Sequence, residues 1–352
     1  MESADEIHLM EHPDSTEEIP TLDIAPFLGG EVGARERIAA ELLEITRTVG
    51  FFYLEGHGVT LDLLNRVFAQ SKRFHELPLD VRRQMPKRGP YGVGHRPLED
   101  RVNPAGDRKP NLSASYGFHR ERELGGVPHV PAGQDVNDWP VVDLPGFRET
   151  LVEYFGTIEA LGRRMLPLWA TAFRVPDAYM EDLFKVPRSS MSLIHYPPQK
   201  EIGKGQFGIA PHTDNGLMTF LAQHDVPGIA IRMPSGHWRV ADIRPGTLLI
   251  NTGNAVVRWG NDQLLSTKHR VINTAGKSRY SIPFFFSPDE TAIVECLPAF
   301  CSEDRPARYP PIKAGDLAQW YFGNNGAGIR QKAAGPDVKS EGLWVPVTEK
   351  VD

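Results

Sequence analysis

Hydrophobic residues recur at helical spacing in the first half of the chain. Between residues 31 and 48, Ile38, Leu42 and Ile45 repeat every three to four positions, which places them on one face of a helix. Gly50 follows this segment and ends it. Further helices are predicted by the same kind of spacing over residues 61–76, 145–173 and 177–184, and a shorter one over residues 316–321.

The hydrophobic pattern becomes short and β-rich after Ser189. Runs such as MSLIHYP, GLMTFLAQ and RYSIPFFFSP combine β-branched and aromatic residues, and they are separated by Gly, Pro, Asn and Asp. This pattern is typical of an antiparallel sandwich or barrel. Two earlier runs, IPTLDIAPFL and FFYLEGHGV, also have the character of strands. The chain is therefore predicted to be mainly β with flanking helices.

Two segments lack a clear hydrophobic pattern. Residues 1–18 are charged and poor in aromatic residues, so we expect a disordered tail. Residues 86–142 are rich in Pro, Gly, Arg and Asp, and their pattern indicates no regular structure. A long irregular stretch inside a compact domain is usually a functional loop or a disordered one. We predict that this segment forms a mobile cover over a substrate site.

Composition narrows the class of protein. The chain has 352 residues and a formal net charge of −6, with acidic and basic residues mixed, which disfavours a nucleic-acid partner. No apolar run approaches the roughly 20 residues that span a bilayer, and the acidic N-terminus lacks the pattern of a secretory signal. We therefore expect a cytoplasmic protein without a membrane partner. Cys296 and Cys301 are interpreted as free thiols, because a secreted disulfide scaffold carries more cysteines.

A candidate metal site lies in the segment APHTDNG. His212 and Asp214 are two residues apart, and residues at this spacing on an extended chain project to the same face. His269 begins another β-rich run. Two imidazoles and one carboxylate leave three adjacent coordination positions open, an arrangement that suits non-haem Fe(II) chemistry with oxygen. The pair His212 and Asp214 alone is weak, because such pairs also occur by chance.

A second pair of polar residues follows His269, the third candidate metal ligand. Arg279 and Ser281 are also two residues apart, so a guanidinium and a hydroxyl share one face of a predicted strand. Together they can clamp a carboxylate. Arg279 alone would more simply make a surface salt bridge. Phe284 and Phe286 project from the opposite face and are core candidates.

These motifs carry a resemblance that extends over residues 19–323. HTDNG, HRV and RYS, with PGTLLINTGN and RWGNDQLLSTKHRV between them, resemble the isopenicillin N synthase-like family of Fe(II)/2-oxoglutarate-dependent dioxygenases. The resemblance implies a double-stranded β-helix (jelly-roll) core over residues 189–325. An N-terminal helical region over 19–188 and a C-terminal tail over 326–352 complete the implied division.

The same resemblance implies an enzyme and its cofactors. His212, Asp214 and His269 would bind Fe(II), Arg279 and Ser281 would hold the far carboxylate of 2-oxoglutarate, and Tyr196 would contact the co-substrate or the substrate. Such an enzyme uses O2, releases succinate and CO2, and hydroxylates, desaturates or cyclises a small molecule. Ascorbate is expected to support its activity.

The sequence departs from the family at two positions. Ile194 stands where many plant members have Asn, so an Asn contact to the co-substrate is absent. Asn254 stands where many members have Asp. We expect Asn254 to precede a connecting strand and to leave the chemistry unchanged.

Three other functions stay open on the sequence alone. A 2-oxoglutarate-independent oxidase resembling isopenicillin N synthase would use the pair Arg279 and Ser281 for its substrate. An ethylene-forming enzyme would fragment 2-oxoglutarate, and a jelly-roll binding protein would catalyse nothing. The substrate pocket is less clear than the metal site. A group of residues in the 86–142 segment favours a polar or carboxylate-bearing small molecule, namely Tyr91, Arg96, Arg101, Asn111 and Tyr116.

Overall fold

The computed structural model describes residues 17–88, 92–98, 110–120, 137–140, 144–199 and 205–325, with side chains as far as Phe322. Most of the predicted N-terminal tail and all of the predicted C-terminal tail lie outside these residues. So do large parts of the predicted cover, including Tyr91 and Arg101. Within the described residues, no helix is both long and apolar enough to cross a membrane.

Helices form at each of the five places where the sequence predicts one, which correspond to α2, α3, α5, α6 and α8, whereas α1, α4 and α7 were not predicted. The bounds of all of them are α1 (Ala25–Leu28), α2 (Ala34–Thr48), α3 (Leu61–Glu76), α4 (Leu79–Arg82), α5 (Phe147–Phe173), α6 (Asp177–Leu183), α7 (Asn254–Trp259) and α8 (Ala314–Asn325). Two of them start slightly later than predicted. Gly33 and Gly146 precede α2 and α5 with φ angles of 76° and 75°, a conformation that glycine adopts without strain.

The strands fall into two main sheets. Their bounds are β1 (Thr21–Asp23), β2 (Phe51–Glu55), β3 (Gly94–Arg96), β4 (Ala114–His119), β5 (Arg188–Tyr196), β6 (Ile209–His212), β7 (Met218–Gln223), β8 (Ile229–Arg232), β9 (Trp238–Val240), β10 (Leu248–Thr252), β11 (His269–Val271), β12 (Arg279–Ser287), β13 (Ile293–Val294) and β14 (Ile312–Lys313). An eight-stranded sheet has the order β1-β2-β10-β7-β12-β5-β4-β3, and a four-stranded sheet has the order β6-β11-β8-β9. The predicted jelly roll with flanking helices is confirmed.

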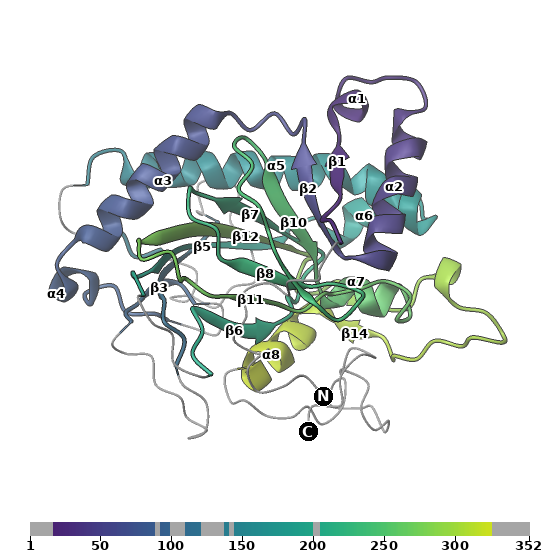
Figure 1. The fold of residues 1–352 in the computed structure, drawn as a ribbon. Coiled ribbons are helices and arrows are strands. Elements are labelled where there is room, and N and C mark those ends of the chain that lie inside the picture. Colours follow the sequence, from purple (N-terminus) through teal and green to yellow (C-terminus); the bar gives the residue numbers. More distant parts are fainter. Residues whose placement is uncertain are drawn as a thin grey trace.

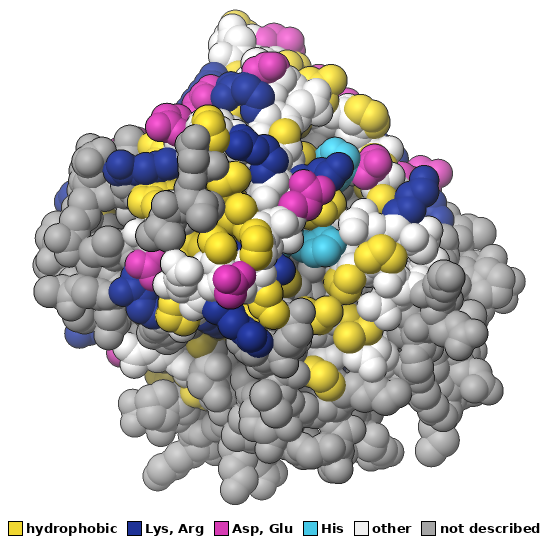
Figure 2. Space-filling view, turned by 90° about the vertical axis from the view of Figure 1, so that its left-hand side faces the viewer, with side chains coloured by type: hydrophobic (Ala, Val, Ile, Leu, Met, Phe, Trp, Pro, Cys, Tyr) yellow, Lys and Arg dark blue, Asp and Glu magenta, His cyan; other side chains and the backbone are white. Residues whose placement is uncertain are grey.

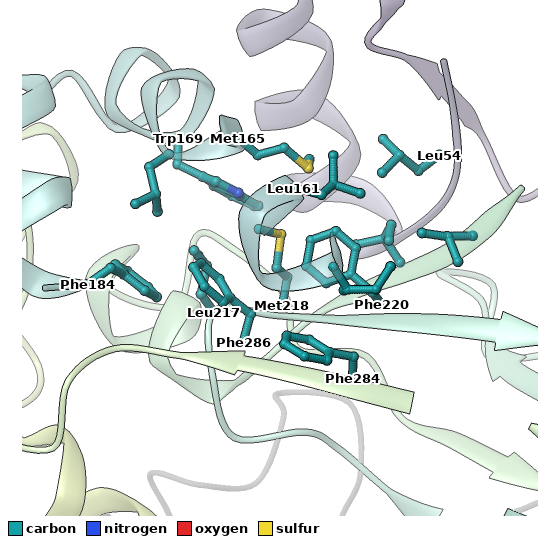
Figure 3. Packing of buried hydrophobic residues seen from close by; sticks show 14 of the residues in the cluster. Leu54, Leu161, Met165, Trp169, Phe184, Leu217, Met218, Phe220, Phe284 and Phe286 are labelled. Atoms are coloured by element: carbon teal, nitrogen blue, oxygen red, sulfur yellow. The ribbon is translucent and has the colours of Figure 1, made fainter. Parts of the chain in front are cut away.

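Helices cover one face of the eight-stranded sheet. In Figure 1, α3 and α5 run along the upper side of this sheet, and the strands of the smaller sheet lie below it. We call the helix-covered face the outer face and the face towards the smaller sheet the inner face. Phe284 and Phe286 point to the outer face, as predicted, and are fully buried. The ring of Phe286 contacts that of Phe184 at a centroid distance of 4.7 Å (Figure 3). The ring of Phe284 contacts that of Phe155 at a centroid distance of 4.8 Å.

The inner face has its own apolar cluster, contributed by both sheets. Side chains of β2, β5, β7 and β10 meet those of β8 and β11, and the members include Phe51, Tyr53, Tyr196, Ile231 and Val271. Residues alternate between the two faces of a strand. A strand of the large sheet therefore contributes side chains both to the core under the helices and to the region between the two sheets.

Two expectations from the sequence are wrong. The segment 86–142 is not irregular throughout, because β3 and β4 extend the large sheet beyond β5. Tyr116 on β4 therefore faces the helices, where its fully buried ring packs 4.6 Å from that of Phe74. Asn254 does not precede a strand: it is the first residue of α7.

Candidate metal and co-substrate site

Three predicted ligands converge between the sheets. His212 ends β6, His269 begins β11, and these two residues are register partners in the small sheet. Asp214 follows β6 by two residues. Its Oδ1 lies 3.8 Å from His212 Nε2 and 3.9 Å from His269 Nε2. One ligand atom from each residue lies within 4.8 Å of the others, so one ion can contact all three.

Backbone carbonyls orient both imidazoles. His212 Nδ1 lies 2.9 Å from Ala210 O, and His269 Nδ1 lies 3.2 Å from Thr267 O. With the proton on Nδ1, each ring donates to its carbonyl and presents the Nε2 lone pair to the cluster. Burial, with the neighbouring His212, lowers the pKa of His269 to about 4, so this ring is neutral near pH 7. A neutral imidazole is the form that binds a metal.

Two side chains hold the carboxylate of Asp214. Its Oδ2 accepts hydrogen bonds from Thr219 Oγ1 at 2.6 Å and from Asn251 Nδ2 at 2.8 Å. Oδ1 therefore remains for an ion. Burial acts to raise the pKa of Asp214, but His269, His212 and the two hydrogen bonds outweigh burial and lower it below its ordinary value. The carboxyl group is thus ionised at neutral pH.

The loop that carries Asp214 is fixed by two helices. At the start of α7, the backbone N–H of Asn254 donates to Asp214 O at 2.8 Å. From α8, the hydroxyl of Tyr321 donates to Thr213 O. These supports were not predicted from the sequence, and neither were Thr219 and Asn251. Asn251 could have been noticed in the sequence, because it is a polar residue within the apolar run LLIN of a buried strand.

The predicted carboxylate clamp is buried on the inner face. Arg279 is 1% exposed, and its Nε donates to Val226 O at 3.2 Å. The guanidinium carbon lies 4.8 Å from the ring centroid of Tyr196, and Ser281 Oγ lies 3.5 Å from the Tyr196 hydroxyl. The structure therefore brings all three predicted co-substrate residues together. Burial lowers the pKa of Arg279, which nevertheless stays charged because arginine starts above 12.

Arg279 requires a partner that the described residues do not supply. Its terminal nitrogens, Nη1 and Nη2, are buried and have no hydrogen-bond partner there. A buried cation without an acceptor is strongly unfavourable, so the surface salt bridge considered above is excluded. A planar fork of free N–H groups matches a carboxylate in two parallel hydrogen bonds. The donor set of two imidazoles and one carboxylate, together with this fork, fits Fe(II) and a dicarboxylic 2-oxoacid.

His57 has a structural role, and the two cysteines are free thiols, as predicted. His57 Nε2 lies 2.9 Å from Gly246 O, and His57 Nδ1 accepts a hydrogen bond from Val59 N. Cys296 and Cys301 are free thiols. On the face seen in Figure 2, the described basic side chains are mixed with acidic and hydrophobic ones and form no continuous stripe.

Comparison with known proteins agrees with this site. Residues 187–288 match the model of the 2OG-Fe(II) oxygenase superfamily, and residues 19–141 match that of the N-terminal region of non-haem dioxygenases in morphine synthesis. The 2-oxoglutarate-Fe(II) type oxidoreductase hxnY of Emericella nidulans is 33% identical over 315 residues, which cover 86% of this chain and 89% of that protein. The chain belongs to the 2OG-Fe(II) oxygenase superfamily.

Solved structures share the fold. A full-length Neurospora crassa protein in complex with alpha-KG has a TM-score of 0.79 and 26% identity, over 90% of this chain and 99% of that one. The complex of the same protein with alpha-KG and thymine has a TM-score of 0.78 and 27% identity, over 87% and 97% of the two chains. The present oxygenase is accordingly a non-haem Fe(II)/2-oxoglutarate-dependent dioxygenase that oxidises a small molecule and uses Fe(II), 2-oxoglutarate and O2.

Proposed function

We propose that His212, Asp214 and His269 bind the Fe(II) of this dioxygenase and that Arg279, Ser281 and Tyr196 bind its 2-oxoglutarate. The proposal depends chiefly on Arg279, whose two terminal nitrogens are buried without a partner among the described residues, on the face of the large sheet that is turned towards the sheet with His212 and His269. Two unsatisfied buried N–H groups in a fork geometry call for a carboxylate. The three proposed ligands His212, Asp214 and His269 leave coordination positions of the ion open, at which the other end of the same molecule can chelate it.

Each residue then has a definite task. Bound Fe(II), with its co-substrate, supplies the oxidising chemistry for a C–H bond of the substrate. The neutral imidazoles provide lone pairs without adding charge, and the carboxylate of Asp214 offsets one of the two positive charges of the ion. The guanidinium of Arg279 balances the negative charge of the far carboxylate of 2-oxoglutarate, and the Ser281 hydroxyl donates a hydrogen bond to the same carboxylate. Burial of Asp214 and Arg279, at 6% and 1% exposure, excludes water from both ends.

The substrate is proposed to be a small polar or carboxylate-bearing molecule, oxidised in the cytoplasm. The Neurospora crassa protein that shares the fold has been crystallised with thymine and with 5-formyluracil, both of them small and polar. Hydroxylation, desaturation and cyclisation all begin with attack on a substrate C–H bond, so the site residues fit each of these outcomes. We expect ascorbate to support turnover.

An oxidase that needs no 2-oxoglutarate is the second candidate. In that enzyme, the unpaired fork of Arg279 would bind a carboxylate of the substrate itself. The relatives named 2-oxoglutarate-Fe(II) type oxidoreductases favour the first candidate.

Succinate release separates the two candidates. Purified enzyme with Fe(II), ascorbate and 2-oxoglutarate is screened against small molecules, and product and succinate are both quantified. The proposal predicts equal amounts of product and succinate, and no product when 2-oxoglutarate is left out. Product formed without 2-oxoglutarate and without succinate would establish the oxidase instead.

A further inference from the structure

The inner face of the large sheet has a closed part and an open part. On β2 and β10, the inner-face residues Phe51, Leu249 and Asn251 are at most 2% exposed, because the small sheet covers this part of the face. Further along the sheet, six inner-face residues are only partly buried. They are Phe285 on β12, Ser190 and Ser192 on β5, Ser115 and His119 on β4, and Arg96 on β3.

The helix-facing residues of the same strands show that this difference is local. Met191, Leu193 and Phe118, which alternate with the partly exposed residues, are at most 1% exposed. Around these residues, the sheet is therefore closely packed on its outer face and partly exposed on its inner face. The open part begins beside the proposed metal ligands. Phe285 is the register partner of Thr219, and the hydroxyl of Thr219 donates a hydrogen bond to Asp214. A substrate that lies in this region would be next to the proposed metal ligands.

Strand register places Arg96 at the far end of the open part. Ser281 of the clamp pairs with Ile194, Ile194 pairs with Ser115, and Ser115 pairs with Arg96. Three strand spacings of ~4.8 Å separate the backbones of Ser281 and Arg96 by about 14 Å. His95 contacts Phe74 on the outer face, at a ring-centroid distance of 5.5 Å, so the neighbouring Arg96 is directed to the inner face.

Arg96 differs from the other polar residues predicted near the substrate. Tyr116 faces the helices, and Asn111 accepts a hydrogen bond from Ala210 N at 3.0 Å. The side chain of Arg96 has neither a hydrogen-bond nor an ion-pair partner among the described residues. Burial without compensation lowers its pKa, although the group stays charged. A half-buried guanidinium of this kind gains from an anion that enters the open part of the face.

We propose that Arg96 determines substrate specificity by binding an anionic group, such as a carboxylate, of a substrate that lies on the open part of the inner face. The proposal rests on the proposed function, because it takes the metal cluster and Arg279 to be occupied by Fe(II) and 2-oxoglutarate. It assigns two separate carboxylate sites to the chain. Arg279, which is buried, selects the co-substrate, and Arg96, which is half-buried at the sheet edge, selects the substrate.

A matched pair of probes tests the charge preference. The enzyme is loaded with Fe(II) and saturating 2-oxoglutarate without oxygen, and the dissociation constants of benzoate and benzamide are measured by ligand-observed NMR. We expect benzoate to bind about 10-fold more tightly, the low end for a charge-assisted contact because Arg96 is partly exposed. The preference should vanish in Arg96→Met, which keeps most of the apolar stem, and return in part in Arg96→Lys.

Two controls keep the inference separate from the proposed function. Arg47→Met removes an exposed charge on α2 and should leave the benzoate preference unchanged. Iron and 2-oxoglutarate should bind Arg96→Met as they bind the wild type. Equal affinity of the wild type for the two probes, or an undiminished preference in Arg96→Met, overturns the inference and leaves the proposed function intact. Loss of the preference in Arg279→Met but not in Arg96→Met overturns both, because the clamp would then hold the substrate.

Discussion

The two faces of the large sheet are built from the same strands but meet opposite requirements. On the outer face, Phe284 and Phe286 are fully buried in contact with other aromatic rings, and these apolar side chains need no hydrogen-bond partners. On the inner face, Arg279 is equally buried but lacks partners among the described residues for two of its nitrogens. A folded chain tolerates such a group only if stability comes from elsewhere. Apolar packing on the outer face stabilises the fold, and the inner face carries the Arg279 N–H groups that are free to bind a ligand.

Removal of a proposed iron ligand should produce the largest effect. Asp214→Ala deletes the carboxylate among the three proposed ligands and leaves the two imidazoles. Loss of a group that merely hydrogen-bonds a ligand typically weakens metal binding by about 10–100-fold, so we expect loss of a direct ligand to exceed that and to abolish turnover. Iron content and turnover are measured beside Asp225→Ala, which changes a largely exposed carboxylate. Wild-type iron content and activity in Asp214→Ala would refute the ligand assignment.

The outer face is tested by Phe284→Ala. The phenyl ring is fully buried and lies 4.8 Å from Phe155 and 6.3 Å from Phe220 between ring centroids. Truncation of such a ring to Ala typically lowers the free energy of unfolding by about 3–5 kcal/mol. Chemical denaturation measures this loss. The iron affinity of the molecules that remain folded should stay close to wild type, and a selective loss of iron would show that the two faces are not separable.

A smaller effect is expected from the support of Asp214. Asn251→Ala removes the hydrogen bond to Oδ2 and leaves Thr219 as the only side-chain donor to that oxygen among the described residues. Iron affinity should fall by about 10–100-fold, as is usual when a hydrogen bond to a metal ligand is lost, while the fold persists. Titration of the metal-free protein with Fe(II) under nitrogen measures the change. An affinity within about two-fold of wild type would mean that Asn251 serves packing alone.

The smallest effect concerns pH. His75 on α3 and His195 on β5 have ring centroids 5.3 Å apart, and burial lowers the pKa of His195 to about 4 and that of His75 well below its ordinary value. In the unfolded chain both titrate near 6.5. Protonation therefore favours unfolding, so this contribution to stability is complete above about pH 6.5 and is lost as the pH falls towards 4.

A single substitution tests the pH effect. His195→Phe retains a ring that can stack on Tyr280, whose ring centroid lies 4.8 Å away, but it cannot be protonated. We expect the melting temperature of this variant to fall less between pH 7 and pH 5 than that of the wild type. Identical pH profiles would show that acid sensitivity arises elsewhere. His237→Phe, in a turn between strands, serves as the matched control.

The sequence predicted the two-sided strand but not the partners across the sheet. Alternation along RYSIPFFF separates Arg279 and Ser281 from Phe284 and Phe286, and it holds because both faces are buried. The same alternation predicted that His212 and Asp214 share a face, whereas His269 was predicted from its place at the start of another β-rich run and from the resemblance of HRV to the family. Thr219 and Asn251 were missed because their role depends on which strands become neighbours. Sequence periodicity along one strand does not record that pairing.

The strands β3 and β4 were missed for a related reason. Both contain glycine, which is unfavourable in strands and predicts loops. Gly117 is required by a close approach, since a Cβ atom there would lie 1.8 Å from Gly92 O. Only the folded chain shows this contact. As a result, the sequence grouped Arg96 with Tyr116, although the two residues face opposite sides of the sheet.

Binding of 2-oxoglutarate to Arg279→Met tests the central claim most directly. Dissociation constants are measured without oxygen on Fe(II)-loaded protein, together with iron content and the unfolding of the ligand-free form. Loss of a charge-assisted contact worth about 2–3 kcal/mol should weaken 2-oxoglutarate about 30- to 150-fold, with iron content unchanged. Ligand-free Arg279→Met should be at least as stable as wild type, because a buried unpaired charge is gone. Wild-type affinity for 2-oxoglutarate in Arg279→Met would contradict the account.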